Sequence, residues 1–139
     1  MIKDATIVRP RYGEVDQMGY VYHGNYVDYC HSARTELMRK MGIHDQELES
    51  RGVMMPVIDF NIKYLKPAHY DEKLTIVTII EDMPQVRFRF KFEIFNPAKE
   101  LITKASSTLV FVDKESRLPM ILPDFIEDVL SVGFEQVLQ

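Results

Sequence analysis

One change in hydrophobic period limits the folds open to this 139-residue chain. From Asn25 to about Met41 the apolar residues recur at steps of three and four, which is the pattern of an amphipathic helix, and Gly42 is a typical stop signal. Beyond Gly42 the pattern becomes an alternation of apolar and polar residues, which indicates strands. The helical stripe consists of Tyr26, Tyr29, Cys30, Ala33, Leu37 and Met41.

Strands are expected over most of the chain after this helix. The clearest is VRFRFKFEIF, residues 86–95, where apolar and charged residues alternate strictly, so that one face is buried and one is wet. VIDFNIKYL, residues 57–65, alternates in the same way. Residues 73–80 and 102–112 are rich in β-branched side chains, which favour strands. The apolar positions of residues 57–65 are Ile58, Phe60, Ile62 and Tyr64.

The two ends of the chain complete the pattern. Residues 5–11, ATIVRPR, predict an edge strand, because an edge tolerates Pro10. Residues 123–133 predict a short helix. A lone long helix followed by antiparallel strands must lay its apolar stripe on one face of the sheet, which gives an α+β two-layer fold. The length predicts a single domain over residues 1–139.

Composition excludes several classes of function. A net charge of −4 with interspersed acids and bases gives no field to attract nucleic acid. No apolar run approaches the roughly 20 residues of a membrane span, and the N-terminus lacks the apolar core of a signal peptide, so we expect a cytoplasmic protein without a membrane partner. The single cysteine, Cys30, and the lack of a Cys/His cluster predict no disulfide and no metal site.

The segment DQMGYVYHGNY, residues 16–26, places an acid and a histidine just before the helix. Backbone N–H groups around His23 would be unpaired at the first helical turn, and the helix dipole makes that end partly positive. The structural alternative is that Asp16 and Gly19 form a turn and that Asn25 caps the helix. Residue types alone favour this structural alternative.

The longer string RYGEVDQMGYVYHGNYVDYCHSARTELMRKMG resembles the signature of the 4-hydroxybenzoyl-CoA thioesterase family of hotdog-fold acyl-CoA thioesterases. A second match is IKYLKPAHYDEKL, residues 62–74. The spacing from the acid to the HxNY run is the specific part, and it shifts the balance towards a functional role. The matching residues are Arg11 and Tyr12, expected on the first strand, then Asp16, Gly19, the VYHGNY run and Arg34.

The resemblance implies an acyl-CoA thioesterase that needs no metal or redox cofactor. Active sites in this family lie at a homodimer interface, and the dimers often pair into a homotetramer. Asp16 would act as nucleophile or general base. His23 would supply an oxyanion-hole amide, and Gly24 would let the substrate approach the backbone.

The same resemblance implies supporting and substrate-binding residues. Lys63 and Lys66 would bind the phosphates of coenzyme A, although both lysines could also be solvated residues on an exposed strand. Tyr64, between them, is expected among the substrate-binding residues. An acyl-carrier-protein thioester could replace the CoA ester, and a non-catalytic thioester-binding protein of the same fold is the alternative from another class. The supporting residues are Gly19, Tyr22, Asn25 and Tyr26.

Two further features are expected to be structural. Cys30 and His31 are neighbours on one helix and point about 100° apart, so they do not form a nucleophile pair. His44 and His69 are expected at the surface.

Overall fold

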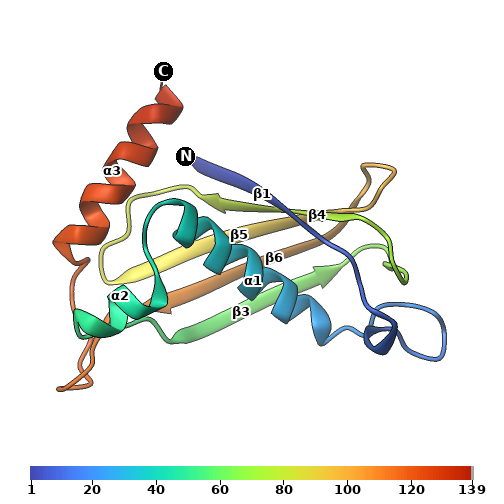
Figure 1. Cartoon of the computed structure of the whole chain (residues 1–139), viewed down its shortest axis with the longest axis horizontal. Coiled ribbons are helices and arrows are strands. Elements are labelled where there is room, and N and C mark those ends of the chain that lie inside the picture. The colour runs from blue at the N-terminus through green and yellow to red at the C-terminus, as the bar shows by residue number, and fades with distance from the viewer. Residues whose placement is uncertain (139) are drawn as a thin grey trace.

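A five-stranded antiparallel sheet with one long helix across its face forms the body of the protein (Figure 1). The computed structural model describes residues 1–138. The strand order is β1-β4-β5-β6-β3, so the expected α+β architecture is confirmed. The elements of this body are β1 (Ile2–Val8), α1 (Asn25–Lys40), β3 (Val57–Tyr64), β4 (Leu74–Ile80), β5 (Arg87–Phe95) and β6 (Leu101–Val110).

Helix α1 buries the stripe that its sequence predicts. Tyr26, Tyr29, Cys30, Ala33 and Leu37 are all buried against the sheet. The last position differs, since Met38 is buried and Met41 is only half-buried. Gly42 follows with a φ of +86°, a left-handed conformation that glycine adopts without strain, and so ends the helix as expected.

Strand β5 supplies the centre of the core. Phe88, Phe90, Phe92 and Ile94 are at most 1% exposed and lie on the face that meets α1, as the alternation predicts. The rings of Phe88 and Phe90 stack with their centroids 4.3 Å apart. Val86 was expected in the same strand, but it precedes β5 and is exposed.

Strand β3 departs from the predicted alternation. Ile58 and Tyr64 are exposed, and Phe60 and Ile62 are only half-buried. The physical reason is position, because β3 is an edge strand with β6 as its single neighbour. A register shift between Val57 and Asp59 also moves Ile58 out of the alternation.

Strand β1 forms the opposite edge, as residues 5–11 predict, but it begins and ends earlier. It ends at Val8, so Arg11 and Tyr12 do not lie on it, contrary to expectation. Tyr12–Glu14 instead form a 3₁₀ turn, η1. Pro10 and Arg11 thereby direct the chain away from the sheet towards the start of α1.

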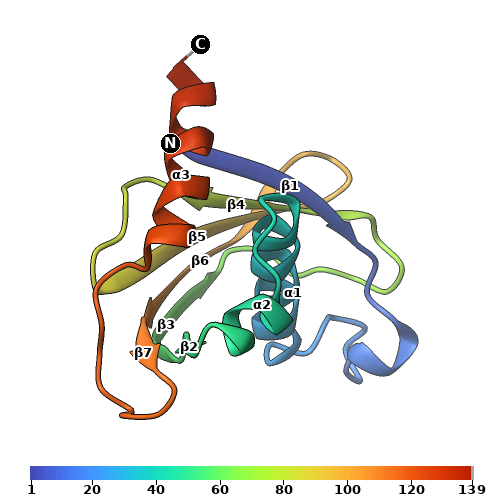
Figure 2. The same ribbon diagram turned by 60° about the vertical axis from the view of Figure 1, so that its left-hand side comes forward.

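The C-terminal helix and three small elements complete the chain. The expected helix is present as α3 (Asp124–Leu138) and runs beside the beginning of β1 (Figure 2), where Gly133 lies against Ile2. No pattern predicted α2 (Asp45–Ser50), or the pairing of β2 (Val53–Met54) with β7 (Val112–Asp113). Within residues 1–138, no helix is long and apolar enough to cross a membrane.

Candidate active site at the start of the long helix

Asp16 opens a tight turn that ends at Gly19. The N–H of Gly19 donates to the Asp16 carbonyl at 3.0 Å, and Gly19 has a φ of +81°. Oδ1 of Asp16 accepts hydrogen bonds from the N–H groups of Met18 at 2.8 Å and Tyr20 at 3.3 Å. The turn anticipated in the structural alternative therefore exists, and it fixes one carboxylate oxygen. Within the described chain, the other oxygen has no hydrogen-bond partner.

The half-buried Asp16 borders an open hollow of about 340 Å³. The hollow lies between the Asp16 turn, the first residues of α1 and the segment that follows β3. Sequence segments about 40 residues apart thus meet at one place. The predicted residues that line it are Asp16, His23, Tyr26, Tyr64 and Lys66.

The backbone N–H groups of His23 and Gly24 are free at the helix start. Neither donates a hydrogen bond to any residue between 1 and 138, whereas the next N–H, that of Asn25, bonds to the Tyr22 carbonyl at 3.0 Å. The positive end of the helix dipole adds to their donor strength. A Cβ on Gly24 would lie 3.0 Å from the ring of Tyr22, so any larger residue at this position would have to displace that ring.

Three hydrogen bonds hold the helix start in position. The Tyr64 hydroxyl donates to the His23 carbonyl at 2.8 Å, and the N–H of Ala68 donates to the Tyr26 hydroxyl at 3.3 Å. Nδ2 of Asn25 donates to the Glu14 carbonyl at 2.9 Å. Asn25 is therefore not the helix cap, because the cap position is Gly24 and no side chain caps the helix. It instead ties the helix to η1.

Glu14 is a structural contributor that sequence reasoning missed. Its Oε1 accepts hydrogen bonds from the Arg11 N–H at 2.7 Å and from the Tyr29 hydroxyl at 3.1 Å, and its carbonyl accepts the Tyr22 N–H at 2.8 Å. Burial opposes ionisation of Glu14, but these hydrogen bonds and the Arg11 charge lower its pKa below the ordinary value. Two features of the sequence could have suggested this role. Glu14 is an acid two residues before Asp16, and Tyr29 is a polar-tipped residue of the predicted buried stripe, which needs a hydrogen-bond partner.

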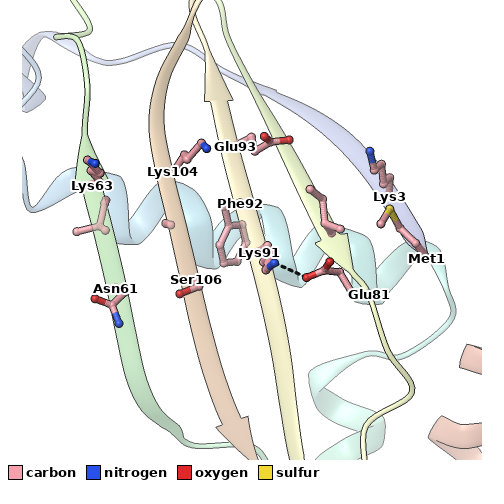
Figure 3. Close-up of a pocket in the computed structure, with 13 residues that line it drawn as sticks. Met1, Lys3, Asn61, Lys63, Glu81, Lys91, Phe92, Glu93, Lys104 and Ser106 are labelled. Atoms are coloured by element: carbon pink, nitrogen blue, oxygen red, sulfur yellow. Dashed lines mark ion pairs between the residues drawn. The ribbon is translucent and has the colours of Figure 1, made fainter.

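The two predicted lysines lie apart. Lys66 is at the rim of the Asp16 hollow, where its ammonium pairs with Glu100. Lys63 is on the outer face of the sheet, away from α1, in a separate groove that also contains Lys104, its cross-strand neighbour (Figure 3). Tyr64 lines the hollow, and neighbouring side chains on a strand point to opposite faces. Lys63 therefore points away from the hollow.

Cys30 does not resemble a nucleophile. Its side chain is fully buried, and burial raises the pKa of its thiol to about 12. His31 is exposed and its Nδ1 contacts Arg34 instead. His69 is exposed as expected, with its Nδ1 2.9 Å from Oε1 of Glu72.

Comparison with known proteins defines the class. Residues 10–130 match the family model of the thioesterase-like superfamily. The acyl-CoA thioester hydrolase YbgC of Escherichia coli O157:H7 is 34% identical over 119 residues, covering 86% of this chain and 89% of YbgC. YneP of Bacillus subtilis (strain 168) is 43% identical over 113 residues, covering 81% and 82% of the two chains.

A solved structure agrees with the sequence match. The DHNA-CoA thioesterase from Staphylococcus aureus superposes with a TM-score of 0.87 at 34% identity, covering 99% of this chain and 91% of that one. Fold and sequence together define a hotdog-fold thioester hydrolase. The chain belongs to the thioesterase-like superfamily, and its relatives support acyl-CoA thioester hydrolysis as its activity. The narrower resemblance to 4-hydroxybenzoyl-CoA thioesterases stays a prediction.

Proposed function

We propose that the protein hydrolyses acyl-CoA thioesters to a free carboxylic acid and CoA, with Asp16 as the essential carboxylate. The observation that carries the proposal is that Asp16 and His23 line the same hollow, at the start of α1, where the backbone N–H groups of His23 and its neighbour Gly24 donate to no residue of the described chain. Hydrolysis needs a base or nucleophile and donors for an oxyanion, and this site offers both.

The proposed roles follow from the geometry. A thioester carbonyl oxygen directed at the His23 and Gly24 amides would gain negative charge at the positive end of the helix dipole. Loss of one such donor costs about 2.7–4 kcal/mol of transition-state stabilisation in a well-studied protease. The Tyr64 hydroxyl holds the His23 carbonyl in place, so Tyr64 would help to position these amides relative to the substrate carbonyl.

Asp16 has two possible roles in the same reaction. As a general base it would take a proton from water while the water oxygen adds to the carbonyl carbon, and the proton would pass to sulfur as the C–S bond breaks. As a nucleophile it would form an acyl anhydride, expel the thiolate, and be regenerated by water. Both routes use only groups of this chain, so we propose hydrolysis without a metal or redox cofactor.

Lys66 is the better placed of the two lysines for the CoA phosphates. It lies at the rim of the hollow, whereas Lys63 lies on the outer face of the sheet. We therefore propose that Lys66 contributes to phosphate binding and that Lys63 contributes less. YbgC is an acyl-CoA thioester hydrolase and the Staphylococcus aureus enzyme a DHNA-CoA thioesterase, and this similarity favours CoA over an acyl carrier protein as the thiol carrier.

We also propose that two copies join along β3 in a homodimer, which could pair again into a homotetramer. The free edge of β3 carries unpaired backbone groups and exposed apolar side chains, with Val57 46% and Ile58 52% exposed. Such an edge is usually covered in soluble proteins. Sedimentation equilibrium at micromolar concentration tests this point, and a 16.3 kDa species would contradict it.

The test of the function is thiol release from a panel of short, medium, long and aromatic acyl-CoAs. Asp16→Asn should lower kcat by roughly 10²–10⁴-fold, the range of general-base catalysis, while binding of CoA esters persists. Asp28→Asn is the matched control, because Asp28 is an exposed acid on the first turn of α1 outside the hollow. Full activity in Asp16→Asn would refute the assignment. If the wild type binds acyl-CoAs but hydrolyses neither them nor carrier-protein thioesters, the protein would instead be a non-catalytic thioester-binding protein.

A further inference from the structure

A second pocket, of about 360 Å³, lies on the flank of α1 beyond the candidate active site. Helix α1, helix α2 and strand β2 enclose it. Its volume is within the range of roughly 300–1,000 Å³ that is usual for small-molecule sites. Apolar side chains form most of its wall, among them Met38, Ile43, Leu48, Val53, Met55 and Leu109.

Arg34 is the unusual member of this wall. Its side chain is half-buried, and burial lowers the pKa of the guanidinium. Among residues 1–138, its one hydrogen-bond contact is from Nη2 to Nδ1 of His31 at 2.8 Å, and no carboxylate lies within ion-pair distance. The acids around the pocket do not pair with the Arg34 guanidinium. Asp45 influences it only through longer-range charge attraction, and Glu49 pairs with Lys114 at 3.3 Å.

A guanidinium removed from water normally has a partner that restores its lost hydration. It presents five N–H donors in a planar fork, which matches the two oxygens of a carboxylate. His31 satisfies one of these donors. The remaining donors and the apolar wall beside them together fit one chemical type, a carboxylate attached to an apolar body.

We propose that this pocket binds an apolar carboxylic acid, with its carboxylate on Arg34 and its hydrocarbon part among the methionine and aliphatic side chains. Arg34 follows His23 by eleven residues, which is roughly 16 Å along a helix axis, so the pocket is distinct from the hollow at Asp16. The site does not depend on the assignment of Asp16. The product class of thioester hydrolysis has this chemistry, so a released acid would itself be a ligand.

Calorimetric titration with decanoate tests the proposal, and decanol, which has the same chain without the charge, is the ligand control. Decanoate should bind the wild type and Asp16→Asn equally well, and decanol much more weakly. Arg34→Gln should weaken decanoate binding by roughly ten- to a hundred-fold, as expected for hydrogen bonds to a charged group. Arg39→Gln is the matched protein control, because Arg39 is on the same helix but exposed and paired with Glu36.

A second variant guards against loss of folding in Arg34→Gln. His31→Glu changes an exposed residue that already contacts Arg34, and a Glu three residues before an Arg on a helix can pair with it. This internal carboxylate should block decanoate while the protein stays folded. Equal affinity for decanol and decanoate, or unchanged decanoate binding in both variants, would overturn the proposal. So would a lower sedimentation coefficient of Arg34→Gln with decanoate binding intact, which would show that Arg34 pairs with a second copy.

Discussion

The hydroxyl of Tyr29 donates a 3.1 Å hydrogen bond to Oε1 of Glu14, and this bond joins helix α1 to the turn that precedes Asp16. Tyr29 is buried, and the same carboxylate oxygen also accepts the Arg11 N–H at 2.7 Å. The position of Asp16 relative to the helix therefore depends on a contact between a core residue and an acid two residues upstream of the proposed catalytic one.

Tyr29→Phe should remove this contact without opening a cavity. A hydrogen bond to a charged group is worth about 1.5–3 kcal/mol, so the free energy of unfolding in urea should fall by a similar amount. The pKa of Glu14 is lowered in the folded state, so its stabilising contribution is present above its ordinary value of 4.5 and is lost as the pH falls through the lower folded value.

The difference in unfolding free energy between Tyr29→Phe and the wild type should accordingly shrink below about pH 4.5. Urea titrations at several pH values from neutral to acidic measure this trend. A difference that stays constant, or that grows in acid, would contradict the proposed link to the ionised Glu14.

Gly19→Ala should destabilise the Asp16 turn by backbone strain alone. Gly19 has a φ of +81° and open space around it, so an added Cβ meets no neighbour but forces a left-handed conformation that costs roughly 1–2 kcal/mol. Gly13→Ala is the control, because Gly13 has equal space and no positive φ. Only Gly19→Ala should lower both thermal stability and kcat, and equal effects of the two substitutions would argue against strain.

The Cys30 thiol should be inert in the folded protein. It is fully buried, and burial raises its pKa to about 12, so a thiol-specific reagent such as DTNB should react only after urea unfolding. Cys30→Ala should keep turnover close to that of the wild type. Rapid labelling of the native protein, accompanied by loss of activity, would revive Cys30 as a nucleophile.

Thr103→Val should stabilise the protein. Oγ1 of Thr103 is buried on the helix-facing side of β6 and has no hydrogen-bond partner within residues 1–138. A buried polar group without a partner costs about 1–3 kcal/mol, and valine keeps nearly the same shape without that polar atom. A rise in the urea midpoint at constant m-value is expected. A fall would indicate that the hydroxyl has a partner in solution.

Hydrophobic periodicity predicted the burial pattern well for elements in the middle of the fold. Helix α1 and strand β5 follow their patterns closely because Leu37 and Phe90 face a continuous core. The pattern misled at β3, where alternation records which residues are apolar but not whether a neighbouring strand exists to cover Ile58. Whether a strand lies at the edge depends on the order of strands in the sheet, and the sequence of one strand does not reveal that order.

For the candidate site, the sequence could indicate which residues lie near the helix start but not which side chains they contact. Asp16 and His23, which the sequence pattern picked out, line one hollow, but the partner of each side chain is set by distant segments. Asn25 was expected to cap its own helix, yet it bonds to Glu14 because η1 lies beside the first turn. Lys63 and Lys66 looked equivalent in sequence and lie apart, because Lys63 is on the outward-facing side of β3 while Lys66 follows the end of that strand, beside the hollow.

The start of α1 is held by Glu14, which precedes the helix, and by Tyr64 and Ala68, which come from one later segment; the longest of these contacts joins residues 42 positions apart. Contacts between such distant segments form late when a protein folds, because the intervening chain must first be ordered. During refolding, helical signal should therefore return before enzymatic activity does. Turnover in this protein would then report completion of the whole fold, since no fragment that ends before Ala68 contains all of the contacts that align the site.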